Sequence, residues 1–192
     1  MACEGFSPVF LRSATAYGFS PRLRFDLVLN NLVAWAYTTG KVYLKSDGKA
    51  WRPLVHVEDM SRAFIAALEA PRSQVHNQAF NVGRTEENYR ICELAEIVRE
   101  VVPGSEVFFA EGATTDQRNY RVRCDKISEY LPDFAPQWDV MLGAGQLYKT
   151  YQEAGLLLED FEGPRYRRVL HIKTLIEKGE LDDRLRWKVT AK

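Results

Sequence analysis

The chain has 192 residues, of which 46% are hydrophobic and 27% charged, and its 26 basic residues balance its 26 acidic residues. This composition is typical of a folded globular protein with one ordinary domain, residues 1–192, and it excludes a disordered chain. The formal net charge of zero gives no overall field that would attract nucleic acid or an anionic membrane, so we expect neither as a partner.

Hydrophobic periodicity and breaker residues predict strands and helices that alternate along the chain. Gly40, Gly155 and Gly179 follow predicted helices as stop signals, and Pro71 ends another helix, which Glu58 or Asp59 opens. In chain order the predicted elements are strand 6–12, helix 26–37, strand 42–44, extended segment 52–57, helix 58–70, strand 78–82, helix 91–102, strand 106–110 and helices 125–131, 141–154 and 164–178. The alternation favours an α/β layer with parallel pairing.

Only segments 6–12 and 78–82 have the pattern of strands in a main parallel sheet, and segment 6–12 is expected to be buried. Two strands make a poor sheet by themselves. We therefore expect a homo-oligomer or a partner chain that covers the exposed edge of this sheet.

The three cysteines are widely spaced and form no CxxC pair, so the sequence favours neither a disulfide framework nor a zinc site. No apolar run approaches the ~20 residues of a membrane-spanning helix. Glu4 and Pro8 interrupt the first residues, which is unlike a signal peptide. The expected location is the cytoplasm.

Five short motifs occur in a fixed order along the chain. They are LRSATAYG at 11–18, NNL at 30–32, WRPLVHVED at 51–59, NVG at 81–83, and DQRNYRV at 116–122 followed by DKI at 125–127. Together they resemble the C-terminal half of the NAD-dependent nucleotide-sugar epimerase/dehydratase family, which are extended short-chain dehydrogenases/reductases. The resemblance runs from residue 6 to about residue 187. It implies an α/β fold made of a truncated, doubly wound, Rossmann-like sheet remnant and a small substrate lobe.

The resemblance also implies a binding site for a nucleoside-diphosphate sugar. It assigns substrate binding to Thr15, Asn31, Leu32, Arg52 and Arg118. The chemistry suits a diphosphate, because an arginine side chain presents a planar fork of donors that matches phosphate oxygens. Asn31 near a helix N-terminus would add a donor beside backbone N–H groups that favour anions. Thr15 stands where many relatives have asparagine.

In that family NAD is held by a glycine-rich turn, and a tyrosine helix supplies acid/base chemistry; both would precede residue 6. We therefore expect no cofactor for the isolated chain and no catalytic residue within it. Tyr37 and Lys41 match the family's tyrosine–lysine spacing but follow segment 6–12, and Gly40 breaks the helix between them. The GAG run at 143–145 follows no strand and is expected to lie in a helix.

Three functions remain open at this stage. The chain is the sugar-nucleotide lobe of an epimerase/dehydratase whose NAD half comes from another chain, or a non-catalytic binding module that retains the site. The third alternative is a structural or interaction protein, or an enzyme with a repurposed cleft.

Overall fold

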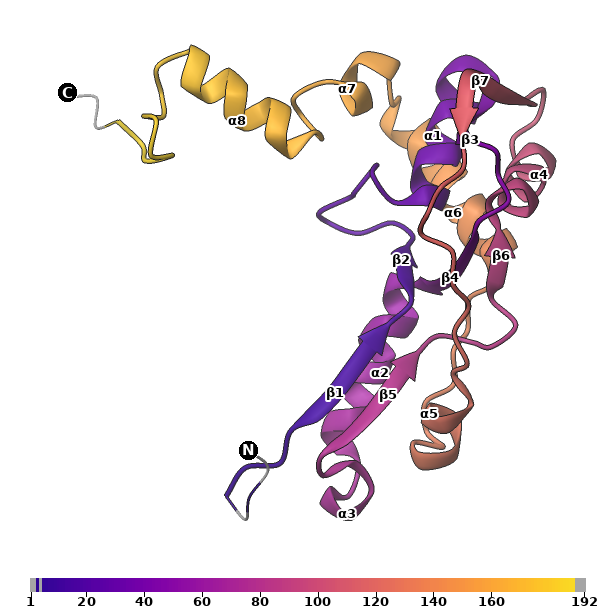
Figure 1. Ribbon diagram of the computed structural model, residues 1–192, viewed down its shortest axis with the longest axis vertical. Helices are drawn as coiled ribbons and strands as arrows, with labels where there is room; N and C mark the ends of the chain where they lie inside the picture. Colours follow the sequence, from indigo (N-terminus) through magenta and orange to yellow (C-terminus); the bar gives the residue numbers. More distant parts are fainter. Residues whose placement is uncertain (1–2, 4, 189–192) are drawn as a thin grey trace.

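The computed structural model describes residues 3 and 5–188, and its architecture is α/β, as predicted (Figure 1). The strands are β1 (Val9–Ser13), β2 (Thr15–Tyr17), β3 (Lys41–Ser46), β4 (Trp51–His56), β5 (Gln78–Val82), β6 (Asn88–Arg90) and β7 (Glu106–Thr114). The helices are α1 (Val28–Thr39), α2 (Val57–Glu69), α3 (Arg72–Val75), α4 (Ile91–Val101), α5 (Asp125–Tyr130), α6 (Val140–Ala154), α7 (Leu158–Glu162) and α8 (Arg168–Glu177).

The strands form three small sheets. β1 pairs with β5 in parallel, which confirms the predicted pairing of the two main-sheet segments, and Leu11 lies opposite Phe80. β4 lies between β2, which is parallel to it, and β6, which is antiparallel. β3 pairs with β7 in parallel. Parallel pairs need crossover connections, and helices supply them here.

Two hydrophobic cores hold these sheets to their helices. The larger core joins α1, α4 and α6 to β3, with Leu29, Leu94 and Leu147 fully buried. The smaller core lies between the β1–β5 sheet and helices α2 and α5, and contains Phe80 and Ile127. Helices α4 and α6 each bury one apolar stripe, as amphipathic helices do. Strand β4 connects the two cores, because Leu54 belongs to the larger core and Val55 to the smaller one.

Strand β1 corrects one expectation, since the segment predicted to be buried is largely uncovered. Val9 and Leu11 pack against the smaller core, but Phe10 on the opposite face is 52% exposed. Because successive strand residues point to opposite faces, only one face of the sheet carries helices among the described residues. The apolar sequence of β1 is therefore typical of a strand that is covered on both faces. Among the described residues, helices cover only the Val9–Leu11 face.

The last helix also differs from the prediction. Helix α8 begins at Arg168, none of its residues is buried, and it projects away from the rest of the molecule (Figure 1). Its predicted packing side, Ile172, Leu175 and Ile176, is only partly covered. Strands β2 and β6 and the short helices α3 and α7 were not predicted, because three to five residues give no readable periodicity.

Helix ends follow the sequence signals closely. Gly40 adopts φ 71° just after α1, where its N–H donates to the carbonyl of Ala36. His56, instead of the predicted Glu58 or Asp59, caps α2, because its ring accepts a hydrogen bond from the Glu58 N–H. Across residues 3 and 5–188, no helix is long and apolar enough to cross a membrane. The same residues contain no cluster of three potential metal ligands.

Candidate functional site

All five predicted substrate-binding residues line one cavity of about 800 Å³, called the first cavity below. They come from four separate parts of the chain: Thr15 from β2, Asn31 and Leu32 from α1, Arg52 from β4 and Arg118 from the segment after β7. The motif order in the sequence therefore corresponds to a real convergence in space.

Arg52 is almost fully engaged by protein groups. Its side chain is 7% exposed, and Nη2 contacts the Asp116 carboxylate at 2.5 Å. Nη1 donates to the carbonyls of Trp51 and Arg118. A guanidinium with these partners fixes the 116–118 segment against β4, because it satisfies a carboxylate and a carbonyl of that segment at once. The geometry makes Arg52 a positioning residue at the wall of the cavity.

Arg118, by contrast, is available to a ligand. Its side chain is 80% exposed. Nε and Nη2 donate to the two oxygens of Asp116 at 3.2 and 3.1 Å. Hydrogen bonding from Arg118 holds the pKa of the Asp116 carboxyl below its usual value, so this carboxylate stays ionised between the two arginines. The outer face of Arg118 remains open to an anion.

At the α1 end of the cavity, Asn31 lines the wall and its buried neighbour Asn30 holds the preceding loop. Asn31 Nδ2 donates to the Phe25 carbonyl at 2.9 Å, so one of its donor hydrogens is already used. Asn30, which the sequence analysis missed, is 1% exposed and accepts a hydrogen bond from the Gly18 N–H at 3.0 Å. Its Nδ2 donates to the Arg24 carbonyl. These hydrogen bonds hold the 18–25 loop against the start of α1. The first turn of α1 carries no acidic side chain.

Several lining residues were missed by sequence reasoning. Asp116 and Tyr120 lie inside the motif that contains Arg118, so their positions could have been flagged. Tyr43 and Lys45 come from β3, where alternation along the strand was the only available signal. They add an aromatic ring and a positive charge to the same cavity.

The two patterns that superficially match NAD-enzyme motifs do not fit NAD. Tyr37 packs its ring against Tyr148, and Lys41 lies over the Phe108 ring, so the pair forms no acid/base site. Gly143 lies inside α6, where a Cβ would meet the Tyr17 ring at 2.2 Å. That glycine permits close packing within the core and offers no turn for a pyrophosphate, as expected for the 143–145 run.

Comparison with known proteins gives a match to one family. Residues 1–83 match the model of the NAD dependent epimerase/dehydratase family. The resemblance to this family is confirmed. The part of this chain that matches the family model includes Thr15, Asn31, Leu32 and Arg52, whereas Arg118 lies beyond it.

Solved structures of nucleotide-sugar enzymes share the fold. UDP-glucuronic acid 4-epimerase from Bacillus cereus, solved with UDP-glucuronic acid and NAD, is 21% identical with a TM-score of 0.63, over 76% of this chain and 45% of the epimerase. dTDP-glucose 4,6-dehydratase from Bacillus anthracis, solved with NAD, is 20% identical with a TM-score of 0.61, over 74% of this chain and 44% of the dehydratase. An epimerase from Methanothermobacter thermautotrophicus is 20% identical with a TM-score of 0.64, over 79% and 45%. The chain spans about half the length of these proteins.

Proposed function

We propose that the first cavity binds a nucleoside-diphosphate sugar, and that this chain is the substrate-binding lobe of an epimerase/dehydratase-like enzyme. The observation that carries the proposal is the convergence of Thr15, Asn31, Leu32, Arg52 and Arg118 on one cavity. The fold shared with nucleotide-sugar enzymes supports it.

The charges of the cavity suit a diphosphate. Arg118 offers its exposed guanidinium directly, while Arg52 and Asp116 hold it in position. Lys45, which also lines the cavity, adds a second positive charge. Asn31 and Thr15 supply polar groups for the sugar side of the ligand. Phosphate groups are bound preferentially by such charge-assisted donors.

Arg118 is the residue to change first. Replacing it with alanine is expected to weaken binding of a nucleoside-diphosphate sugar by about one to two orders of magnitude, since a hydrogen bond to a charged group is worth ~1.5–3 kcal/mol. Titration calorimetry with UDP-, GDP-, CDP- and dTDP-sugars measures it. Arg118 suits this test better than Arg52, because the Arg52 side chain also holds the loop.

The matched control is Arg123→Ala. Arg123 lies five residues further along, is equally exposed, pairs with Asp125 and does not line the first cavity. The Arg123→Ala variant loses the same charge outside the cavity, so binding of the sugar nucleotide should be unchanged. Absence of binding at millimolar concentration for every sugar nucleotide, or equal losses in both variants, would refute the proposal.

We also propose that hydride chemistry needs a NAD-binding polypeptide segment that docks on the β1–β5 sheet. Parallel sheets are normally covered on both faces. Here the Phe10 face is open, and β1 pairs only with β5 among the described residues. On the opposite side of this sheet, the outer surface of helix α2 carries Phe64, Ile65 and Leu68 as further exposed apolar side chains. Free strand edges and apolar patches of this kind recruit partners.

The purified chain is therefore expected to associate and to bind an apolar dye, and Phe10→Ser should reduce both. Solution mass by light scattering and dye fluorescence measure these effects. Phe109→Ser removes a similarly exposed ring from β7 and serves as the control, which should leave the mass unchanged. A single-chain mass with no dye binding, or NAD turnover with a sugar nucleotide by the single chain, would contradict the proposal.

A further inference from the structure

Helix α2 presents apolar side chains on two opposite sides. Toward the β1–β5 sheet it buries Ala63 and Ala67 in the smaller core. On its outer side Phe64, Ile65 and Leu68 are 49%, 53% and 85% exposed, and these three residues are called the α2 patch below. A helix that packs on a sheet normally has one apolar stripe, which faces the core. A second stripe of adjoining apolar side chains on the outer side marks a surface for interaction.

The α2 patch is separate from the surfaces already described. Helix α2 lies on the side of the β1–β5 sheet that Val9 and Leu11 face, whereas Phe10 points to the other side (Figure 1). No residue of the α2 patch lines the first cavity. A segment that covers the Phe10 face would therefore leave the α2 patch open, and the inference drawn from it does not rest on the proposed function.

Two charged residues flank the α2 patch along one side. Arg62 lies three residues before Ile65 and Glu69 four residues after it, so both lie on the same flank of the helix at ~3.6 residues per turn. Arg62 keeps 35% of its side chain exposed while it pairs with Glu58 and Asp59. Glu69 is exposed and forms no ion pair within residues 3 and 5–188. The flank is therefore basic at its start and acidic at its end.

This order of charges fits a second copy of the same helix in antiparallel orientation. An antiparallel pair centred between positions 65 and 66 brings Arg62 of one copy level with Glu69 of the other, on the same flank. A two-fold axis repeats the contact, because both copies use the same surface. The same register places Leu68 of one copy beside Phe64 of the other. A parallel pair would instead set Arg62 against Arg62 and Glu69 against Glu69, which is repulsive.

We propose that two copies of this chain associate through their α2 patches, as an antiparallel helix pair with a two-fold axis near Ile65. The apolar side chains of the two patches interdigitate, and the Arg62–Glu69 pairs close one flank. A contact centred on three side chains per copy is smaller than the roughly 1,200–2,000 Å² of a standard interface. The dissociation constant of the dimer is therefore expected in the micromolar range.

Sedimentation equilibrium of the full chain tests the contact, in a Phe10→Ser background that weakens association through the open face of the β1–β5 sheet. This parent chain is expected to be a dimer at concentrations above the micromolar range. Leu68→Lys should weaken the dimer by at least about 10-fold, because the lysine loses the apolar contact and lies beside Arg62 of the second copy. Leu68 is 85% exposed, so the fold of the single chain should tolerate the change.

The matched control is Leu157→Lys in the same background. Leu157 is also an exposed leucine, and it lies at the start of α7, outside the α2 patch. The control variant gains the same charge and should leave the dimer unchanged.

Cysteine cross-linking tests the orientation of the two helices, in a Cys3→Ser background because Cys3 is exposed. Ile65→Cys lies next to the proposed axis and should give a disulfide-linked dimer under mild oxidation. Ser61→Cys lies one turn earlier on the same side of α2. In the antiparallel pair it is about 13 Å along the helix from its counterpart, beyond the ~7 Å between Cα atoms that a disulfide spans, so it should not cross-link.

Three results would overturn the proposal. A single-chain mass for the Phe10→Ser parent means that the α2 patch does not bind a second copy. Equal weakening of the dimer in Leu68→Lys and Leu157→Lys means that association is not located at α2. Equal cross-linking at positions 61 and 65 means that the helices meet in parallel or at random.

Discussion

Asp59→Ala is expected to lower the free energy of unfolding by about 3–5 kcal/mol, because it leaves buried donors without an acceptor. Asp59 lies in the first turn of α2 and is 1% exposed. Its Oδ1 accepts hydrogen bonds from the Gln137 N–H and Arg62 Nη1, and its Oδ2 accepts one from the Trp138 N–H, all at 2.7–2.9 Å.

This carboxylate links two distant parts of the fold. The bonds to 137 and 138 hold the segment that leads into α6, and the Trp138 ring stacks on His56 at 3.9 Å. Helix α6 then packs against α1, which carries Asn31. Loss of Asp59 should therefore loosen the scaffold of the first cavity as well as destabilise the protein.

Urea unfolding of three variants measures the effect. Asp59→Asn retains one acceptor oxygen and should lose about half as much stability as Asp59→Ala. Asp133→Ala changes an exposed carboxylate outside this network and should be nearly neutral. If Asp59→Ala and Asp133→Ala unfold at the same urea concentration, the role assigned to Asp59 is wrong.

Sequence reasoning succeeded where the signal was local or was carried by motif order. The bounds of β5 were predicted correctly, because Gln78–Val82 lies between clear turn residues. The stop of α1 at Gly40 follows from glycine's access to positive φ. The grouping of Thr15, Asn31 and Arg52 was predicted from a family resemblance, because no periodicity in the sequence relates residues so far apart.

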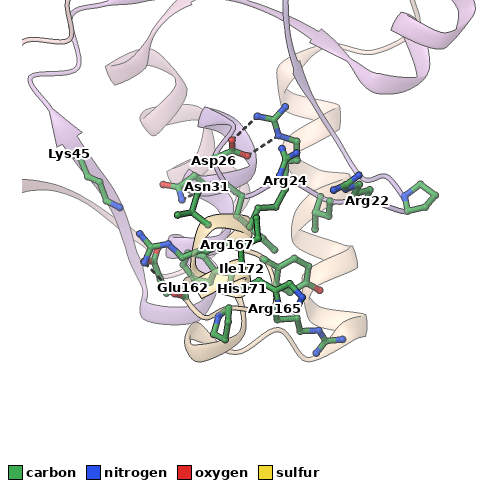
Figure 2. Close-up of a pocket in the computed structure, with 18 residues that line it drawn as sticks. Arg22, Arg24, Asp26, Asn31, Lys45, Glu162, Arg165, Arg167, His171 and Ile172 are labelled. Carbon is green, nitrogen blue, oxygen red and sulfur yellow. Dashed lines mark hydrogen bonds and ion pairs between the residues drawn. The ribbon is translucent and has the colours of Figure 1, made fainter. Parts of the chain in front are cut away.

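Sequence reasoning was insufficient where contacts between distant parts of the chain decide which residues are covered or bound. The sequence of β1 contains apolar residues on both faces, but whether the Phe10 face is covered depends on segments that pack there. Arg52 has the same sequence signal whether it binds a ligand or Asp116, and only the geometry distinguishes the two. Arg165, Arg167 and Arg168 lie together at the rim of a cavity (Figure 2), and no local pattern in the sequence indicates this grouping.

Gly18→Ala is expected to destabilise the protein by a similar amount, about 3–5 kcal/mol, for two separate reasons. Gly18 has φ 102°, a conformation that an alanine adopts only with strain. A Cβ at this position would also lie 2.2 Å from His56 Nε2. The His56 ring has no room to move, because it stacks on Trp138 and contacts Gln146 Oε1 at 2.9 Å.

The two contributions can be separated by thermal unfolding. Gly104→Ala is the matched control, since Gly104 has φ 75° and a Cβ added there would have no neighbouring atom within 4 Å, so it reports backbone strain alone. Its melting temperature should fall by a few degrees, and that of Gly18→Ala by about 10 °C. In a His56→Ala background the added cost of Gly18→Ala should shrink towards that of Gly104→Ala, because the overlap is gone. Equal melting temperatures for Gly18→Ala and Gly104→Ala would mean that the His56 ring yields, and that the loop joining β2 to α1 is less tightly held than its contacts indicate.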